Sequence, residues 1–377
     1  MSKCMICGAK LNGKPLIELL NAPSCAQDLP DKIESSDRYS IDLHLHQCHN
    51  CGLIQFDCEP VPYYRDVIRG GGFSETIQSL RRKQYLHLID KYDLKGKKII
   101  EIGCGEGEFI LPLQDFQVQA FGIEHRMELV NKARERGLNV WKSFPETPDT
   151  VIDNGPFDAF LLFQFLEHQP KPNDMLQCIR NNLTENGIGL ISVPSFEYVL
   201  AKNGFYELMR DHLAYYTEDS FRFLMQYNGF EVIELEIVNG NTISAVVRKR
   251  KAINLSCFSD NFEILTKKLK EFSKEHKSKG KKISVWGASH QAFMILSVTG
   301  FGKEVEYIID SADFKQGKYA PASNVPIVSP EYWFTCPVDC IVIIAPEYAM
   351  EISLAAKKKY GYEIETYSLC GSDLFIV

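Results

Sequence analysis

Residues 99–109 read IIEIGCGEGEF, an apolar run that breaks into a turn with glycine at every second position. A strand that ends in a glycine-rich turn and continues into a helix is typical of nucleotide-binding α/β folds. This turn also carries Glu106 and Glu108. Carboxylates near a helix N-terminus suit the helix dipole but repel a bound phosphate, so the turn favours a nucleoside ligand without phosphate.

Two more acidic residues restrict the class of ligand that this turn can bind. Glu101 lies at the end of the strand, where a cationic or hydroxyl-bearing ligand is easier to seat than a pyrophosphate. Glu124 ends the next apolar run, AFGIE, at the offset of about 20 residues where an acid holds the ribose diol of a nucleotide. A positively charged nucleoside without phosphate meets these conditions, and S-adenosylmethionine is such a molecule.

The pattern around the turn predicts an α/β protein. From about residue 77 to residue 247, apolar runs alternate with helical patterns, as in a sheet covered by helices. The expected strands of this core are residues 98–102, 119–123, 159–163, 189–193, 230–235 and 244–248. Residues 249–261 break the pattern and are interpreted as a linker. A second α/β series follows, with expected strands at residues 283–286, 305–309 and 340–344.

Length, charge and composition limit the class of protein and its partners. The chain has 377 residues, a net charge of −7 and a pI near 5.8. This length suggests two or three domains, and this charge argues against nucleic acid as a partner. The basic run at residues 267–282 has apolar residues at helical spacing and is interpreted as a solvated helix face. No apolar run reaches the ~18–20 residues of a membrane span and no secretory signal is present, so we expect a cytoplasmic protein with no membrane partner.

The first 65 residues contain two Cys-x-x-Cys pairs, CMIC and CHNC, each followed by glycine. Each pair can present two thiolates from one tight turn, and four thiolates around one Zn²⁺ form a closed, structural site. The predicted zinc ligands are Cys4, Cys7, Cys48 and Cys51. Three nearby histidines could replace a ligand, namely His44, His46 and His49. The alternative is a set of free thiols or a disulfide. A small lobe with little hydrophobic core of its own is stabilised better by a bound metal ion than by either of these.

Three segments resemble the class I S-adenosylmethionine-dependent methyltransferases: EIGCGEGEF, FGIEH and FLEHQPKP. The cysteine lobe, the DHLAYYT segment and the C-terminal VWGASHQAF and DSADFKQGKYAPASNVPIVSPE segments resemble, more narrowly, the sugar C-methyltransferases of deoxysugar pathways. The resemblance covers nearly the whole chain. It implies a zinc-binding lobe at residues 1–65, a Rossmann-like methyltransferase core at 66–250 and a second Rossmann-like domain at 251–377 that covers the acceptor cleft.

The resemblance also implies which residues bind the cofactor. The backbone of the glycine turn approaches the methionyl part, Glu124 accepts the ribose hydroxyls, and residues 144–146 border the adenine. Gln164, at the carboxyl end of an expected strand, faces the cofactor or the acceptor. The predicted cofactor-binding residues are Glu101, Gly103, Gly105, Gly107, Glu124, Phe144, Glu146 and Gln164.

The predicted catalytic residues also follow from the resemblance. In the sugar C-methyltransferases, a nucleotide-linked 4-keto sugar loses the proton beside its carbonyl, and the enolate attacks the sulfonium methyl. This chemistry needs a base and a group that stabilises the enolate oxygen. The family motif Tyr-x-Glu-His-Leu here reads MRDHL, residues 209–213. His212 therefore matches the base and Asp211 the residue that orients it, whereas Met209 replaces the tyrosine and cannot donate a hydrogen bond.

Tyrosines elsewhere are candidates for the missing phenol. Tyr215 and Tyr216 lie three and four residues after His212, a spacing that brings them to the site if the segment is helical. Further polar residues are candidates for binding the acceptor. They are Tyr64, Arg65 and Arg69 after the cysteine lobe, His168 in FLEHQPKP, and His290, Lys315 and Tyr348 in the C-terminal domain.

Two alternatives to C-methylation stay open at this point. A hydroxyl or amine acceptor needs no enolate stabilisation, so O- or N-methylation of a sugar or another small metabolite is the alternative among enzymes. A non-catalytic, zinc-bearing interaction module is the alternative outside enzymes, and the intact glycine turn with Glu124 argues against it. The predicted function is methylation of a small, nucleotide-linked keto sugar by a monomer or homodimer.

Overall fold

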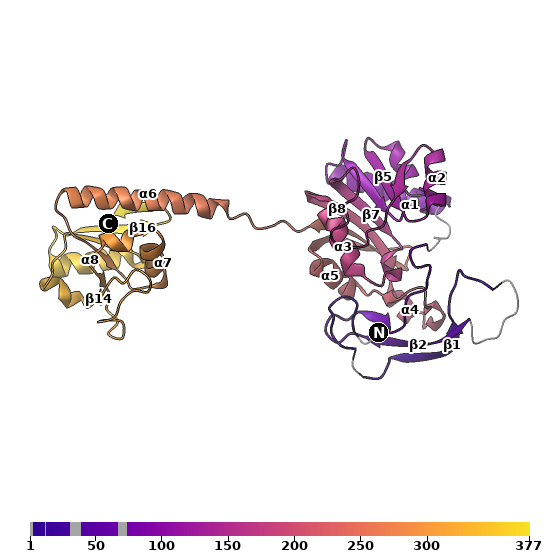
Figure 1. Cartoon of the computed structure of the whole chain (residues 1–377), viewed down its shortest axis with the longest axis horizontal. Coiled ribbons are helices and arrows are strands. Elements are labelled where there is room, and N and C mark those ends of the chain that lie inside the picture. The colour runs from indigo at the N-terminus through magenta and orange to yellow at the C-terminus, as the bar shows by residue number, and fades with distance from the viewer. Residues whose placement is uncertain (1–2, 12, 31–38, 67–73) are drawn as a thin grey trace. The chain divides into compact units, whose positions relative to one another are not determined.

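The computed structural model describes residues 3–11, 13–30, 39–66 and 74–377. The chain forms two compact units, Met1–Lys251 and Ala252–Val377 (Figure 1). Each unit contains a sheet with parallel strands, which confirms the predicted α/β class. The first unit holds both the cysteine pairs and the glycine turn, and the boundary at residue 65 stays a prediction. None of the described helices is both long and apolar enough to span a bilayer.

A seven-stranded sheet with the order β10-β11-β8-β7-β4-β5-β6 is the centre of the first unit. Its strands are β4 (Lys98–Ile102), β5 (Gln119–Glu124), β6 (Asn139–Lys142), β7 (Phe157–Phe163), β8 (Leu183–Pro194), β10 (Phe230–Val238) and β11 (Thr242–Lys249). From β4 the chain adds β5 and β6 on one side and then crosses to β7 on the other. Ligands of open α/β sheets bind at the carboxyl ends of the strands beside such a reversal, and the glycine turn lies there.

Helices cover both faces of this sheet. They are α1 (Glu75–Lys91), α2 (Met127–Glu135), α3 (Pro172–Asn181), α4 (Phe196–Ala201) and α5 (Glu218–Tyr227). Ile99 and Leu161 belong to one core together with residues of α1, whereas Ile100 and Leu162 belong to another core together with residues of α3 and α5. Side chains alternate along a strand and both faces are buried, so apolar residues occupy consecutive positions, Ile99 and Ile100 in β4 and residues 159–163 in β7.

A second, smaller sheet of the first unit has the order β1-β2-β3-β9. Its strands are β1 (Ile17–Pro23), β2 (Ser40–Gln47), β3 (Ile54–Phe56) and β9 (Ala214–Tyr215). β9 follows directly after His212, and Tyr215 pairs with Ile54 of β3. The condition under which Tyr215 and Tyr216 would reach the site, a helical segment, is therefore not met, because residues 214–215 pair with β3 and α5 begins only at Glu218.

The second unit is built on a six-stranded sheet with the order β14-β13-β12-β15-β16-β17. Its strands are β12 (Ile283–Trp286), β13 (Ile308–Ile309), β14 (Ile327–Val328), β15 (Cys340–Ile343), β16 (Glu365–Cys370) and β17 (Asp373–Ile376), and its α-helices are α6 (Ser256–Ser278), α7 (His290–Val298) and α8 (Ala349–Tyr360). α6 begins inside the predicted linker, which is therefore shorter than expected. The basic residues of α6 are largely exposed while Leu265 and Leu269 are buried, which confirms the solvated helix face.

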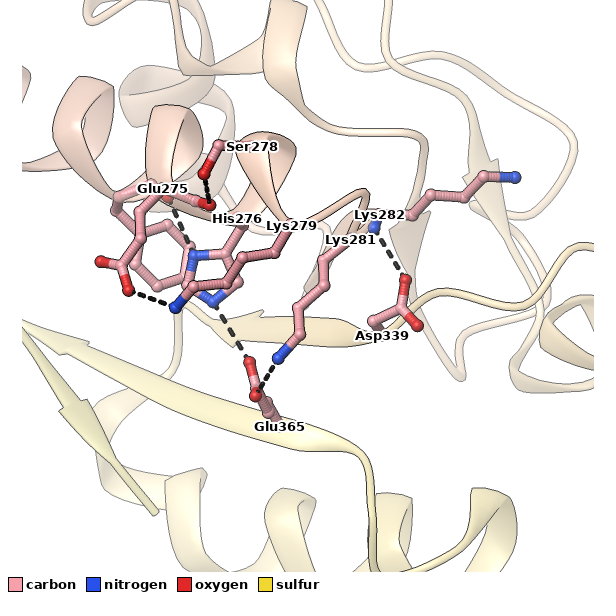
Figure 2. A network of polar contacts seen from close by, with 9 residues as sticks. Glu275, His276, Ser278, Lys279, Lys281, Lys282, Asp339 and Glu365 are labelled. Carbon is pink, nitrogen blue, oxygen red and sulfur yellow. Dashed lines mark hydrogen bonds and ion pairs between the residues drawn. The ribbon is translucent and has the colours of Figure 1, made fainter.

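A polar network joins the end of α6 to the sheet of this unit (Figure 2). The imidazole Nε2 of His276 lies 3.2 Å from a carboxylate oxygen of Glu365, and the Lys281 ammonium is paired with the same carboxylate. The backbone N–H of Lys282 donates to Asp339 at 2.8 Å. These contacts fix the helix against the amino-terminal edges of β15 and β16.

Candidate active site

The four predicted zinc ligands lie together in the first unit. The Sγ atoms of Cys4 and Cys51 are 3.5 Å apart, as are those of Cys7 and Cys48, and all four sulfurs lie within 4.8 Å of one another. Tetrahedral Zn²⁺ with bonds of about 2.3 Å places its ligand sulfurs about 3.8 Å apart, so this set fits the ion. The histidines are engaged elsewhere or exposed: His44 and His46 approach Asp57 at 3.6 and 3.5 Å, and His49 is exposed.

The turn after β4 depends on its glycines. Gly103, Gly105 and Gly107 all have positive φ angles, 66°, 57° and 84°. A Cβ on Gly103 would lie 2.9 Å from the Phe165 ring, and a Cβ on Gly107 would lie 2.1 Å from Leu138. Any other residue would strain the backbone and collide with its neighbours, so the turn stays narrow and its backbone is open to a ligand.

The acids around the turn have different environments. Glu124 is buried, and its two carboxylate oxygens accept the backbone N–H groups of Gly105 at 3.0 Å and of Arg126 at 2.9 Å. Each oxygen retains a lone pair for a ligand hydroxyl. Glu106 instead pairs with Lys132 and Arg136 of the α2 region, and the Lys132 contact is the main cause that lowers its pKa. From the sequence, the Glu106 carboxylate was expected to repel a bound phosphate, but these two cations offset its negative charge.

Residues predicted for the two ligands meet around Phe144, which the resemblance expects to border the adenine. The ring of Phe144 lies 6.5 Å from that of Tyr64 and 6.3 Å from that of Phe165, measured between centroids. The Arg65 guanidinium lies 5.2 Å from the centre of the Phe144 ring and pairs with Glu146. Tyr64 and Arg65 thus contact predicted cofactor-binding residues. Arg69, the third candidate of this segment, lies outside the described residues.

A cavity of about 420 Å³, here called the central cavity, is lined by Phe109, which follows the glycine turn. Five of the residues singled out by the sequence line it: Gln164, His168, Met209, Asp211 and His212. Gln164 follows β7 with a φ of 50°, an uncommon conformation for a residue with a side chain. The buried Glu167, from the FLEHQPKP segment, and the buried Arg81 of α1 also line the cavity, and no sequence motif pointed to Arg81. This set combines acid–base groups with amide and guanidinium donors.

Two histidines contact each other in this cavity. The ring centroids of His168 and His212 are 4.7 Å apart. Nδ1 of His168 lies 2.6 Å from the carbonyl oxygen of Asp211 and must donate to it, which leaves Nε2 with its lone pair. Burial lowers the pKa of both imidazoles, that of His212 to about 3, so both are neutral near pH 7. With Glu167 they form a group of metal-ligand types whose ligand atoms lie within 4.8 Å of one another, and the same neutral imidazoles carry lone pairs that can take part in proton transfer.

Asp211 does not contact His212 in the way its place in the motif suggests. Its carboxylate accepts the hydroxyl of Tyr63 at 2.7 Å and the backbone N–H of Ala26 at 3.0 Å. Burial, together with this carboxylate, raises the pKa of Tyr63 to about 12. The expected orienting contact between the Asp211 side chain and the base is absent from the described contacts, and the Asp211 backbone instead orients His168. Sequence reasoning missed Tyr63, the first tyrosine of the YYRD segment.

The two tyrosines after His212 do not reach the cavity. The Tyr215 hydroxyl accepts the backbone N–H of Met209 at 2.8 Å and donates to a nearby backbone carbonyl, and Tyr216 is fully buried with its hydroxyl on the Leu166 carbonyl. Burial raises the pKa of both phenols. The Tyr215 side chain supports the turn that carries Met209, the Tyr216 hydroxyl contacts the segment before His168, and neither residue lines the cavity.

Comparison with known proteins decides the family. Residues 77–235 match a family model described as a methyltransferase domain, and residues 246–364 match one described as a C-methyltransferase C-terminal domain. The chain is 23% identical to the C-methyltransferase NovU of Streptomyces niveus, over 93% of this chain and 91% of that protein. The chain is a class I S-adenosylmethionine-dependent methyltransferase. The alternative of a non-catalytic, zinc-bearing interaction module is therefore rejected.

Two further proteins resemble parts of this methyltransferase. It is 28% identical to the ubiquinone biosynthesis O-methyltransferase of Glaesserella parasuis, over 32% of this chain and 56% of that protein. The crystal structure of magnesium protoporphyrin IX methyltransferase from Synechocystis superposes with a TM-score of 0.38 at 14% identity, covering 50% of this chain and 90% of that one. Both matches are partial, and neither bears on the acceptor.

The remaining acceptor candidates of this methyltransferase lie in its second unit. His290 begins α7, and Tyr348 lies just before α8; both side chains are exposed. The Lys315 ammonium donates to the Asp310 carboxylate at 3.0 Å and to the Ala288 carbonyl at 2.9 Å. These residues follow the carboxyl ends of strands of their own sheet, and their part in acceptor binding stays a prediction.

Proposed function

We propose that this methyltransferase methylates a carbon beside the carbonyl of a small keto sugar, in nucleotide-linked form, with His212 as general base. The observation that carries the proposal is the neutral His168–His212 pair in the central cavity. The C-terminal match to a C-methyltransferase family model and the similarity to NovU support methylation at carbon. We also propose a structural Zn²⁺ on Cys4, Cys7, Cys48 and Cys51, which would cross-link the two knuckles.

The residues divide the chemistry among themselves. S-adenosylmethionine, when bound at the glycine turn, supplies the electrophilic methyl group. His212 takes the proton from the acceptor carbon. The electron pair left on that carbon then forms the new carbon–carbon bond as the sulfur–methyl bond breaks. His168 is held by the Asp211 carbonyl and packs against His212, with ring centroids 4.7 Å apart, so it positions the base. The Gln164 amide lines the cavity and donates to the enolate oxygen in place of the tyrosine that Met209 replaces.

The test separates proton removal from methyl transfer. The enzyme is incubated in D₂O with a nucleotide-linked 4-keto sugar and S-adenosylhomocysteine, so that methylation cannot compete with exchange. We expect deuterium at the carbon beside the carbonyl, and His212→Gln should slow this exchange at least about 100-fold, the usual worth of a general base. His87→Gln, an exposed histidine of α1, is the matched control and should exchange at the wild-type rate.

The same acceptor is then offered with S-adenosylmethionine. A product methylated at carbon, lost in His212→Gln, supports the proposal. Methylation at oxygen or nitrogen without any deuterium exchange would refute carbon methylation and favour the alternative, in which the neutral histidine pair deprotonates a hydroxyl or accepts the proton of an amine.

A further inference from the structure

Three side chains of metal-ligand types meet at the amino-terminal edge of the sheet in the second unit. They are His276 in the last turn of α6, Cys340 at the start of β15 and Glu365 at the start of β16. One ligand atom of each lies within 4.8 Å of those of the other two. Ligands of open α/β sheets bind at the opposite, carboxyl edge, so this group is separate from any Rossmann-like binding site of the unit.

The sheet itself brings two of these residues together. β15 and β16 are parallel, and Cys340 is paired with Glu365 in their register. Paired residues of neighbouring strands point to the same face of a sheet, and His276 reaches both of them from α6. Cys340 is fully buried and His276 is 5% exposed, so the fold fixes both side chains. The Glu365 side chain is 35% exposed, which leaves a path for an ion.

The imidazole of His276 is oriented as a metal ligand is. Its Nδ1 lies 2.9 Å from the carbonyl oxygen of Phe272 and must donate to it, and a ligating histidine typically holds its other nitrogen by such a contact. Nε2 then points at Oε2 of Glu365, 3.2 Å away (Figure 2). A lone pair and a carboxylate oxygen repel each other, so a cation must lie between them, either a proton on Nε2 or a metal ion.

The position of Cys340 favours a metal ion over a proton. An imidazolium paired with Glu365 needs no third group, whereas a metal ion does, and the Cys340 sulfur is within reach of both atoms. Tetrahedral Zn²⁺ with bonds of about 2.0–2.1 Å to nitrogen and oxygen places these ligands about 3.3–3.4 Å apart, close to the 3.2 Å between Nε2 and Oε2. Thiolate and imidazole are the ligands that select zinc, whereas Mg²⁺ and Ca²⁺ prefer oxygen.

The charges around the group are compatible with a zinc thiolate. The Lys281 ammonium pairs with Oε1 of Glu365, which leaves Oε2 to the ion, and this contact is the main cause that lowers the pKa of Glu365. Burial raises the pKa of Cys340, while the charge of Lys281 acts in the opposite direction and favours its thiolate. Relative to an imidazolium beside a thiol, Zn²⁺ that replaces the protons of Nε2 and Sγ leaves the net charge of the group unchanged.

We propose that Nε2 of His276, the Cys340 thiolate and Oε2 of Glu365 bind a structural Zn²⁺, with water as the fourth ligand on the exposed side of Glu365. The protons of Nε2 and of the thiol pass to solvent as the ion binds. The ion cross-links α6 to β15 and β16. This site is distinct from the cysteine cluster of the first unit and takes no part in methyl transfer.

The zinc content of the full chain tests the site. The protein is equilibrated with Zn²⁺, freed of loosely bound metal by gel filtration and analysed by elemental mass spectrometry. We expect His276→Gln and Cys340→Ser each to lose about one zinc ion per chain, because each removes one of three protein ligands. His290→Gln, an exposed histidine of α7 in the same unit, is the matched control and should keep the wild-type content. Equal zinc contents in the wild type and both ligand variants overturn the inference.

A measurement on the wild-type chain covers the case in which the variants misfold. Cadmium replaces zinc in thiolate sites, and in cadmium NMR an ion bound by four sulfurs resonates far downfield of one bound by a single sulfur with nitrogen and oxygen. We expect a resonance of the second kind, and its absence overturns the inference. Cys48→Ser should remove only the downfield resonance. The two resonances, and the deuterium-exchange assay, are therefore independent, so failure of the proposed function or of the first zinc site leaves this result interpretable.

Discussion

The two units carry the same hydrogen-bonded frame at the carboxyl end of their first parallel strand. In the first unit, the Glu124 carboxylate accepts the N–H groups of Gly105 and Arg126; in the second, the Asp310 carboxylate accepts those of Ala288 at 2.7 Å and Ala312 at 2.9 Å. The two frames differ in whether a cationic side chain also pairs with the carboxylate. Lys315 pairs with Asp310, whereas the described contacts bring no cation to Glu124.

This difference shows how one frame serves two purposes. Gly287 is the single glycine of the second turn, and a Cβ there would have 3.7 Å to its nearest neighbour. Each of the three glycines of the first turn has a close neighbour: a Cβ would lie 2.9 Å from Phe165 at Gly103, 2.9 Å from the Glu108 carboxylate at Gly105 and 2.1 Å from Leu138 at Gly107. A crowded turn with an unneutralised acid suits a cationic nucleoside, and a roomier turn closed by a lysine suits a scaffold.

The largest effect is expected from Gly103→Ala. The new Cβ would lie 2.9 Å from Phe165 at a φ of 66°, and such strain costs about 1–3 kcal/mol, so affinity for S-adenosylmethionine should fall about 10- to 100-fold by titration calorimetry. Gly137→Ala is the control, because its φ is also positive but its Cβ would meet nothing within 4 Å. Equal losses of affinity in the two variants would show that crowding in the turn is irrelevant.

An intermediate effect is expected from removing each acid in turn. Glu124→Gln should weaken S-adenosylmethionine binding about tenfold, the worth of a hydrogen bond to a charged group. Asp310→Asn should leave that affinity unchanged and lower the free energy of unfolding of the second unit by about 1–3 kcal/mol, because Lys315 loses its partner. Titration calorimetry measures the affinity for S-adenosylmethionine, and urea unfolding measures the free energy of unfolding. If Glu124→Gln and Asp310→Asn change the affinity and the stability to the same extent, the proposed difference between the two units is wrong.

The smallest effect is expected from pH. Burial lowers the pKa of His212 to about 3, so the base is already neutral at pH 5 and kcat/KM should change less than about twofold between pH 5 and 8 from this group. The unfolded state binds the proton more tightly, so this histidine reduces stability as the pH falls from about 6.5 toward 3. An acid limb of kcat/KM with a midpoint near pH 6.5, absent in His212→Gln, contradicts a buried base.

The sequence predicted the core better than the site. β4 has the predicted bounds because consecutive apolar residues, Ile99 and Ile100, are buried on its two faces and the glycine turn follows its last residue. β6, which reads NVWK at the sheet edge, is only partly buried, so it was missed. The partners of Asp211 could not be predicted either, since Tyr63 lies 148 residues away and no local pattern links them.

The charges at the site illustrate the same limit. The sequence places Glu106 beside the ligand turn, but only the fold shows that Lys132 and Arg136 compensate it. Burial likewise gives the His168–His212 pair its neutral state, and the two residues are 44 positions apart in the chain. Motifs locate such residues, whereas their protonation and partners depend on packing between distant segments.

The pairing of β9 with β3 also bears on the order in which the protein is made. Ile54 emerges from the ribosome long before Tyr215, its partner in the small sheet. Until residue 215 is synthesised, β3 presents an open edge, and unpaired edges of this kind promote aggregation. The same pairing places Tyr215, whose hydroxyl holds the Met209 backbone, so closing this edge also fixes the turn that carries Met209, whereas Val238, Asn241 and Thr242 of the cavity wall are synthesised later.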